Sequence, residues 1–469
     1  MNLSLQDFGK VFFCTGARNH DLLAILENHE IEFEYDERMA SFKSLGLNKI
    51  AKLPSLVCTT SGTAVAECVP AMLEAQYSDV PFILISGDRP KKMHGTGAPQ
   101  TIDHEGVTRA CRGSYLEVTL EEFKKLKIEK ALFPLHINVL IDDSLPHKES
   151  VIHHEGTEGF GLFLSKSKTP LFLISHEYQS MRPLIEKLKE KKVTFYAETL
   201  SGGRELSTIE SEKQLIHLLK GGHFDAIVRI GHTPLSKIWR LLEMKHLPVY
   251  SFDARGRSGL SYGHVSNYSS KELINNSHFW QALKNFENTE LHSPESNLET
   301  LLVKFPHSEP SNLRRIQNEL RPGDLIYLGN SLVVRFFELI QNRALEVYGS
   351  RGVNGIDGQL ATAIGLASGT KQRVICILGD ITTLYDLSSL REMPQNLKLV
   401  IINNRGGRIF EMLKLDKRIV MEHEIDFAEI TSGFGLTYSQ EIKDFNTVQV
   451  LELHPDRLQT EIFLKEWNP

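Results

Sequence analysis

The sequence predicts an α/β protein in which each domain is a mostly parallel sheet flanked by helices. Short, continuous apolar runs rich in Val and Ile recur along the chain, and such runs are typical of strands buried on both faces of a parallel sheet. Each run ends in small and polar residues, and a segment with helical periodicity follows, so strand, loop and helix alternate. The 469 residues suffice for about three domains of ~150 residues.

Breaks in this alternation predict the domain boundaries. We expect a first domain over residues 1–150, a central domain over 162–290 and a last domain over 312–469. The stretches 142–161 and 290–311 contain Pro and polar residues with little apolar period, which is typical of linkers. The first and last domains look alike in their succession of strands and polar loops.

The individual elements follow from the same patterns. In the first domain the apolar runs predict strands at 11–14, 31–35, 56–59 and 81–86, with a helix from 22. In the central domain they predict strands at 169–175, 225–231 and 247–253, with a helix around 184–188. In the last domain they predict strands at 325–328, 345–349, 375–378, 399–402 and 448–453, with helices at 332–340 and 360–368. The tail from 430 has no other clear pattern.

Composition narrows the class of protein. The formal net charge of −6 is mild and no basic face is evident, so we expect no nucleic-acid partner. No apolar run approaches the ~20 residues of a membrane helix, and the first residues lack the features of a signal peptide. The cysteines are few and odd in number, which predicts buried free thiols in a reducing, cytoplasmic compartment. They are Cys14, Cys58, Cys68, Cys111 and Cys376.

Two strands of the last domain end in hard oxygen donors. The run 375–378 leads into Gly379 and Asp380, and the run 399–402 leads into Asn404, with Gly406 close behind. Ligands of open α/β sheets bind outside the carboxyl ends of the strands. A few oxygen ligands suit Mg²⁺ shared with a phosphate, which amide dipoles at the start of the next helix would also favour. The alternative is a Gly-Asp turn without chemical meaning.

The strand ends are far more specific as a set. In chain order they are 36–38 (DER), 60–66 (TSGTAVA), 88–90 (DRP), 97–100 (GAPQ), 329–335 (GNSLVVR), 350–352 (SRG), 355–358 (GIDG), 379–380 (GD), 384–387 (LYDL) and 403–410 (NNRGGRIF). Together they closely resemble the 2-succinyl-5-enolpyruvyl-6-hydroxy-3-cyclohexene-1-carboxylate synthase family, thiamine-diphosphate enzymes of menaquinone biosynthesis. The resemblance covers nearly the whole chain and is weakest in the central domain and the tail.

The resemblance implies pyrimidine-binding, central and diphosphate-binding domains, in that order. It implies thiamine diphosphate and Mg²⁺ as cofactors, with Mn²⁺ as an alternative ion. The cofactor would lie between the first domain of one subunit and the last domain of another, in a homodimer or homotetramer. The implied activity is that of a transferase, which decarboxylates 2-oxoglutarate and adds the succinyl-semialdehyde unit to isochorismate in a conjugate (1,4) addition.

The family's functional residues map onto matching positions here. The catalytic pair would be Glu37 and Gln100. The cofactor-binding residues would be Glu37, Thr60, Ser61, Gly62, Asn330, Ser331, Ile356, Gly379, Asp380, Asn404, Ile409 and Phe410. The metal ligands would be Asp380, Asn404 and Gly406. The substrate-binding residues would be Arg18, Arg89, Gln100 and Lys237 for isochorismate, and Arg335 and Arg351 for 2-oxoglutarate.

Physical chemistry supports several of these roles. A carboxyl group bonded to the aminopyrimidine promotes the imino tautomer that helps remove the thiazolium C2 proton, which is the role implied for Glu37. Both substrates are polyanions, so guanidinium and ammonium groups are required. Each residue could instead have a purely structural role. Glu37 could be an exposed partner of Arg38, Ile356 and Phe410 could serve only packing, and any single Arg could be a solvated surface group.

Two departures from the family pattern concern the acceptor. Ala17 stands where a serine is usual and removes a hydroxyl near the expected isochorismate site, and Asn354 stands where a small residue is usual. A related thiamine-diphosphate decarboxylase or carboligase with another acceptor therefore stays open, as does a non-catalytic homologue. A nicotinamide oxidoreductase is disfavoured, because no G-x-G-x-x-G follows a strand with an acidic residue at the right distance.

Overall fold

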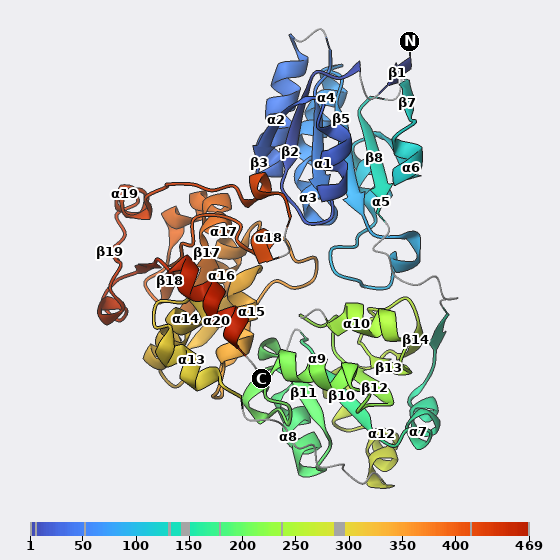
Figure 1. Cartoon of the computed structure of the whole chain (residues 1–469), viewed down its shortest axis with the longest axis vertical. Coiled ribbons are helices and arrows are strands. Elements are labelled where there is room, and N and C mark those ends of the chain that lie inside the picture. Colours follow the sequence, from blue (N-terminus) through green and yellow to red (C-terminus); the bar gives the residue numbers. More distant parts are fainter. Residues whose placement is uncertain are drawn as a thin grey trace. The chain divides into compact units, whose positions relative to one another are not determined.

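The computed structural model describes residues 2–4, 7–50, 53–129, 133–141, 151–177, 180–235, 238–285, 296–412 and 415–467. These residues form three six-stranded sheets with helices packed around them (Figure 1). Neighbouring strands run parallel throughout all three sheets. β1 (Asn2–Ser4) and β7 (Lys127–Glu129) form a separate antiparallel pair. The predicted fold class is confirmed.

The first sheet has the strand order β3-β2-β4-β5-β8-β6. Its strands are β2 (Lys10–Cys14), β3 (Glu30–Glu34), β4 (Leu56–Thr60), β5 (Ile83–Asp88), β6 (Ser114–Thr119) and β8 (Leu135–Leu140). Its helices are α1 (His20–Leu26), α2 (Glu37–Asn48), α3 (Thr63–Glu67), α4 (Val69–Tyr77), α5 (His104–Ala110) and α6 (Leu120–Phe123). The four predicted strands are present, and β4 and β5 are entirely buried, as their continuous apolar runs require.

The last sheet repeats this arrangement, with the order β16-β15-β17-β18-β20-β19. Its strands are β15 (Leu325–Leu328), β16 (Glu346–Tyr348), β17 (Val374–Gly379), β18 (Leu397–Ile402), β19 (Tyr438–Ser439) and β20 (Val450–Leu453). Its helices are α14 (Glu309–Glu319), α15 (Leu332–Ile340), α16 (Gln359–Ser368), α17 (Asp380–Tyr385), α18 (Ile409–Met412), α19 (Phe427–Gly433) and α20 (Arg457–Glu466). Because both sheets place their strands in the same succession, the predicted likeness of the first and last domains is confirmed.

The central sheet follows a different order, β11-β10-β12-β13-β14-β9. Its strands are β9 (Ile152–His154), β10 (Pro170–Ile174), β11 (Phe195–Ala197), β12 (Ala226–Ile230), β13 (Val249–Phe252) and β14 (Gly263–Ser266). Its helices are α7 (Thr157–Ser165), α8 (Arg182–Glu190), α9 (Glu212–Lys220), α10 (Ile238–Lys245), α11 (Ser270–Leu273) and α12 (Ser277–Ala282). The three predicted strands and the helix at 184–188 are present.

Both predicted linkers contain regular structure, so those predictions are wrong for the described residues. β9 and most of α7 lie within 142–161, and α13 (Leu298–Lys304) and the start of α14 lie within 290–311. β9 is a short edge strand with two exposed His residues, and two glycines weaken the helical signal of α7. Residues 142–150 and 286–295 lie outside the described residues.

The described chain divides into two compact units. Residues Met1–Leu145 pack with the short segments Gly352–Asp357 and Arg405–Glu424 in the first unit, and the remainder, with the central and last sheets, forms the second. The five cysteines are buried and free, as predicted. Among the described residues no helix has the length and apolar character that a bilayer crossing requires.

Candidate active site

The strand order of the first and last sheets places a topological switch point within each. β2 lies between β3 and β4, and β15 lies between β16 and β17, so successive connections leave in opposite directions at these points. Ligands of open α/β sheets bind at such switch points. Predicted site residues follow these strands directly, including Arg18, Ser61, Asn330 and Asp380. The topology therefore supports the same edges that the sequence singled out.

Glu37 is the first residue of α2, immediately after β3. Asp36 caps this helix, because its side chain accepts a hydrogen bond from the backbone N–H of Met39 at 2.8 Å. The exposed guanidinium of Arg38 lies 3.8 Å from the carboxylate of Asp36. Glu37 is only partly exposed, and its charge, added to burial, raises the pKa of the Cys14 thiol. Arg38 thus has a carboxylate partner other than Glu37.

The loop after β4 carries three of the predicted cofactor-binding residues. Gly62 has φ +94° and caps α3, and a Cβ there would lie 2.9 Å from Cγ1 of Val353, so this position requires glycine. Nη1 of Arg18 donates to Oγ of Ser61 at 2.5 Å. Oγ1 of Thr63 donates to Oδ1 of Asp357 at 2.7 Å. The loop is thus held against the Arg18 loop and the segment that contains Ile356, which is partly buried.

Arg89 and Gln100 belong to the same assembly. Arg89 is buried, and its Nε donates to the carbonyl oxygen of Pro99 at 3.0 Å. Gln100 has φ +59°, a left-handed backbone that non-glycine residues seldom adopt, and its Cα lies 3.5 Å from the position a Gly62 Cβ would take. Arg18, Arg89 and Gln100 are therefore linked around the Gly62 loop. Lys237 lies outside the described residues.

Two guanidinium groups adjoin Asn330 in the last sheet. Nη1 of Arg351 donates to Oδ1 of Asn330 at 2.6 Å, and Nη1 of Arg335 donates to the carbonyl oxygen of Ser331 at 2.5 Å. Burial and then the neighbouring charge of Arg335 lower the pKa of Arg351 to about 9. Burial also lowers the pKa of Arg335, although Glu212 opposes this. A bound carboxylate would relieve the repulsion between these cations, so the pair can serve as an anion site.

The helix that carries Arg335 is anchored on the central sheet by Glu338. The Glu338 carboxylate accepts a hydrogen bond from Tyr196 Oη at 2.7 Å and forms an ion pair with Arg204 at 3.0 Å. It also accepts a hydrogen bond from the backbone N–H of Thr199 at 2.5 Å. Glu338 is buried, and a buried carboxylate with several donors fixes its helix firmly. This anchor was not predicted from the sequence.

The predicted metal ligands Asp380 and Asn404 follow the adjacent strands β17 and β18. Asp380 begins α17 directly after Gly379, is buried, and accepts a hydrogen bond from the backbone N–H of Ile381 at 2.7 Å. Nδ2 of Asn404 donates to Oε2 of the buried Glu309 at 3.0 Å. That bond directs the amide nitrogen of Asn404 to Glu309, so its Oδ1 is the atom available to a cation. A carboxylate and an amide oxygen fit Mg²⁺ held jointly with a phosphate.

Burial raises the pKa of Glu309 to about 7, while Asn404 lowers it and Asp380 raises it further. In the described chain no three His, Cys, Asp or Glu side chains gather as metal ligands. Gly406 has φ +135°, and a Cβ there would lie 2.7 Å from the carbonyl oxygen of Val420. Glycine is therefore required there, in the segment 405–424 of the first unit.

Ile409 and Phe410 open the short helix α18 and are partly buried. Phe410 packs on the core of the first unit, which includes Phe13 and Ile419. A packing role for Phe410, one of the alternatives raised by the sequence, is thus supported directly.

Several polar groups near strand ends were missed from the sequence. Ser175 and His176 follow β10, and His232 follows β12, where its Nδ1 lies 2.9 Å from Oδ2 of Asp253. Burial, together with the charges of His232, Arg351 and Arg229, lowers the pKa of His176 to about 3. The central sheet therefore carries more strand-end chemistry than its sequence indicated. The sequence does show a polar residue after each of these apolar runs. The residues with which these polar groups interact, however, lie far away in the sequence.

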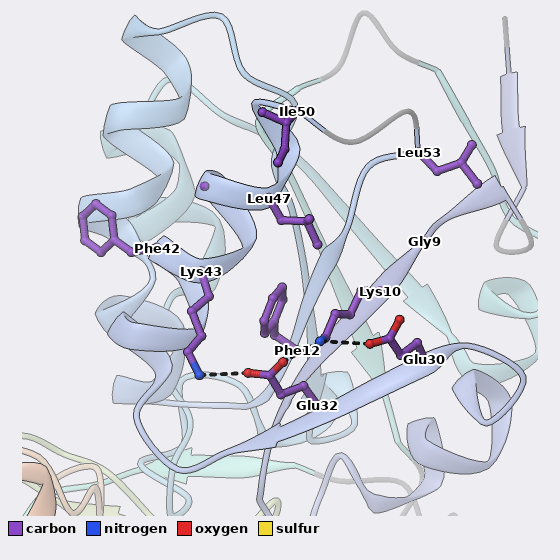
Figure 2. Close-up of a pocket in the computed structure, with 11 residues that line it drawn as sticks. Gly9, Lys10, Phe12, Glu30, Glu32, Phe42, Lys43, Leu47, Ile50 and Leu53 are labelled. Atoms are coloured by element: carbon purple, nitrogen blue, oxygen red, sulfur yellow. Dashed lines mark hydrogen bonds and ion pairs between the residues drawn. The ribbon is translucent and has the colours of Figure 1, made fainter.

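A pocket of about 880 Å³ lies elsewhere in the first unit, beside the first residues of β2 and β3 and under α2 (Figure 2). Lys10 and Lys43 line it and form ion pairs with Glu30 and Glu32, at 3.0 Å and 2.8 Å respectively. None of the predicted site residues lines this pocket. Because ligands of such sheets bind at the carboxyl edge, the pocket is not the candidate active site.

Two comparisons with known proteins found related sequences. The family model "Thiamine pyrophosphate enzyme, N-terminal TPP binding domain" matches residues 3–107. A 2-succinyl-5-enolpyruvyl-6-hydroxy-3-cyclohexene-1-carboxylate synthase from Bdellovibrio bacteriovorus is 32% identical, with 97% of this chain and 94% of the relative covered. The enzyme of that name from Akkermansia muciniphila is 30% identical, with 96% and 93% covered. The one from Bacillus pumilus is 27% identical, with 96% and 91% covered.

The fold, the candidate site at the strand ends and the match of residues 3–107 to the family model together define a thiamine-diphosphate-dependent enzyme. The identity to relatives holds over nearly the full length of both chains. The chain belongs to the 2-succinyl-5-enolpyruvyl-6-hydroxy-3-cyclohexene-1-carboxylate synthase family.

Proposed function

We propose that this protein decarboxylates 2-oxoglutarate and adds the resulting succinyl-semialdehyde unit to isochorismate by a conjugate (1,4) addition. The product is 2-succinyl-5-enolpyruvyl-6-hydroxy-3-cyclohexene-1-carboxylate, so the enzyme is a transferase of menaquinone biosynthesis. The observation that carries this proposal is full-length similarity to synthases of that name in a chain whose strand ends present the required charged groups.

Thiamine diphosphate, when bound, supplies the carbanion chemistry of the reaction. Glu37, at the start of α2, holds the aminopyrimidine by its ring nitrogen and moves the proton there. The loop of Thr60, Ser61 and Gly62 contributes backbone and hydroxyl groups to the same side. Ile356 would pack against the cofactor, and Gln100, which lies beside Gly62, would orient the substrate.

The last sheet supplies the phosphate side of the site. Asp380 and Asn404 are the proposed Mg²⁺ ligands, with the carbonyl of Gly406 as the third, and Gly379 allows close approach of the phosphate. Mn²⁺ is an alternative ion with the same oxygen preference. Asn330, Ser331 and Ile409 line the cofactor site.

The two substrates are assigned to two groups of cations. Arg335 and Arg351 bind the side carboxylate of 2-oxoglutarate, which is supported by their lowered pKa values and by the effect of the Arg335 charge on the pKa of Arg351. Arg18 and Arg89, with Gln100 and Lys237, bind the carboxylates of isochorismate. Planar guanidinium groups suit this task because they bind carboxylates in a bidentate manner.

Asn354, one of the two departures from the family pattern, has a local explanation. Its φ is +64°, and Asn tolerates this left-handed backbone better than most residues. Asn354 therefore need not signal a different acceptor. Ala17 is exposed. It is the remaining departure from the family pattern that could change the acceptor substrate.

The assembly is proposed to be a homodimer, or a tetramer built from dimers, with each active site shared between subunits. Large apolar side chains are exposed on and beside α2 and α4 in the first unit, which supports burial of this face by another subunit: Met39, Phe42, Ile50, Leu53, Leu73 and Tyr77. The free buried thiols support a cytoplasmic location. The ranges 1–150, 162–290 and 312–469 are proposed as the pyrimidine-binding, central and diphosphate-binding domains, with the central range extended back to β9 and the last range back to α13.

An omission assay tests the function. Loss of isochorismate absorbance would be followed with thiamine diphosphate, Mg²⁺, 2-oxoglutarate and isochorismate, leaving out one component at a time. We expect turnover only when all four are present. Release of carbon dioxide from 2-oxoglutarate at the same rate without isochorismate would instead favour a decarboxylase or carboligase with another acceptor, and Ala17→Ser would then be the first variant to examine.

A further inference from the structure

Asp88 and His104 form a buried pair in the first unit that the mechanism above does not use. Asp88 ends β5, His104 begins α5, and both side chains are almost completely buried. Oδ2 of Asp88 accepts hydrogen bonds from Nδ1 of His104 at 2.9 Å and from Nδ2 of Asn138 at 3.1 Å, and Nε2 of His94 lies 3.1 Å away. Oδ1 accepts from the backbone N–H of Arg89 at 2.7 Å.

The hydrogen bonds of His104 fix its protonation. Nε2 of His104 lies 3.1 Å from the backbone nitrogen of Gly62, which can only donate. Nε2 must therefore carry a lone pair, so the ring is neutral and its proton is on Nδ1, where Asp88 accepts it. Burial would raise the pKa of Asp88, but the hydrogen bonds from His104 and His94 hold it well below its usual range. Asp88 thus remains a carboxylate and selects this tautomer.

The backbone N–H held by His104 lies at the centre of the proposed cofactor loop. Gly62 caps α3 with a left-handed φ. Its neighbours Ser61 and Thr63 bond to Arg18 and Asp357 through their side chains. Those two bonds fix the ends of the loop, and the bond to His104 fixes the glycine between them. A buried N–H without an acceptor would be costly, so loss of His104 Nε2 would displace Gly62 from this position.

We propose that His104, oriented by Asp88, is a positioning residue that sets the Thr60–Thr63 loop for the cofactor. His104 acts through Gly62 and does not touch the reacting atoms. Asp88 also bonds the backbone of Arg89, so one carboxylate positions the cofactor loop and an isochorismate-binding residue together. The catalytic consequence rests on the proposed function, whereas the hydrogen bond to Gly62 does not.

Two amide substitutions separate the two nitrogen atoms of His104. In His104→Gln the amide oxygen can reach the position of Nε2 and accept from Gly62. In His104→Asn the amide reaches only the position of Nδ1, so it can donate to Asp88 but leaves the Gly62 N–H without its acceptor. Both variants lose the ring, which makes them matched controls for each other. His278→Gln and His278→Asn, at an exposed position, control for the substitutions themselves.

We expect His104→Asn to weaken thiamine diphosphate binding, measured by intrinsic fluorescence, about 10-fold, the size expected for a buried N–H that loses its acceptor. His104→Gln should stay within about 3-fold of the parent, since it keeps an acceptor. Hydrogen exchange of the peptide containing Gly62 should accelerate in His104→Asn and not in His104→Gln. The KM for 2-oxoglutarate should change little in either variant.

Equal behaviour of the two variants, or better retention by His104→Asn, would overturn the proposal, because His104 would then serve only Asp88. If the parent protein fails to consume isochorismate, the proposed function fails. In that case the rate of hydrogen exchange in the peptide that contains Gly62 still shows whether His104 holds the loop. The two failures are therefore distinguishable.

Discussion

At the scale of single residues, the candidate site contains groups whose orientation is set by a second side chain. Asp36 caps the helix that begins with Glu37, Glu309 orients the amide of Asn404, and Arg351 donates to Asn330. Ordered partners of this kind reduce the cost of reaching a productive geometry. Substitutions of the oriented residues Glu37, Asn404 and Asn330 should therefore affect chemistry or cofactor binding more than stability.

Glu37→Gln should abolish nearly all turnover while leaving folding and diphosphate binding intact. The amide keeps the size of the carboxyl group but cannot exchange a proton with the pyrimidine nitrogen. We expect a loss of about 10²–10⁴-fold in kcat, measured by isochorismate consumption at saturating cofactor. Near-normal turnover would show that Glu37 is not the catalytic carboxyl group.

Glu309→Gln should raise the Mg²⁺ concentration needed for half-maximal binding of thiamine diphosphate by about 10-fold, a typical effect of removing a partner of a metal ligand. Glutamine lacks the buried charge and can donate as well as accept, so it no longer specifies the amide orientation of Asn404. A fluorescence titration with Mg²⁺ measures this. Glu299→Gln, at an exposed partner of Arg314, is the control, and identical curves for both variants would refute the assignment.

The residues that could be predicted from sequence are those that directly follow a buried strand, such as Asp380 and Asn404. The missed residues His104, Glu309 and Glu338 have partners 42, 95 and 142 positions away in the chain. No local pattern relates such pairs, because only the packed sheets and helices bring them together. Residues of the second kind were therefore available only from the structure.

At the scale of elements, continuous apolar runs located buried strands well. Strands without such a run were missed, both at sheet edges and inside the sheets at β8 and β14. β18 is buried throughout and β17 at all but its last residue, and both were predicted within about two residues. β9 and β19 have three and two residues, lie at sheet edges and retain exposure. An edge strand buries little apolar surface, so its sequence carries little of the pattern on which prediction depends.

The helix cap at Asp36 offers a test at this scale. Asp36→Ala should lower the free energy of unfolding by about 1 kcal/mol, because the first turn of α2 loses an acceptor. Asp36→Asn should cost much less, since asparagine caps about as well. Urea unfolding measures both. Equal stabilities for the two variants would show that the bond to Met39 does not stabilise α2.

At the scale of the whole molecule, the first and last sheets share one strand order, and the central sheet does not. Two sheets of the same topology present two equivalent switch points, and ligands of open α/β sheets bind at such points. The alternation of strands and helices predicted this likeness, but the order of strands within each sheet depends on long-range pairing and could not be derived from it.

Stability should fall on mild acidification. Burial lowers the pKa values of both His136 and His176 to about 3, whereas a histidine in the unfolded chain takes its proton near pH ~6.5. The unfolded state therefore binds more protons between these values. The stabilisation is complete above pH ~6.5 and is lost progressively as the pH falls toward 3.

Thermal unfolding between pH 8 and pH 5 checks this expectation. The midpoint should be flat above pH ~6.5 and fall below it. His278→Gln, at an exposed position, should leave the slope unchanged. A midpoint that is constant down to pH 5 would show that the buried histidines are not held neutral.

The most direct test of the central claim is the mass of the product formed from 2-oxoglutarate labelled at its C1 carboxylate. With thiamine diphosphate, Mg²⁺ and isochorismate present, we predict that all of the label leaves as carbon dioxide. The product mass should equal the sum of the two substrates minus carbon dioxide. Labelled carbon dioxide without such a product, or a product in which isochorismate is not incorporated, would contradict the account.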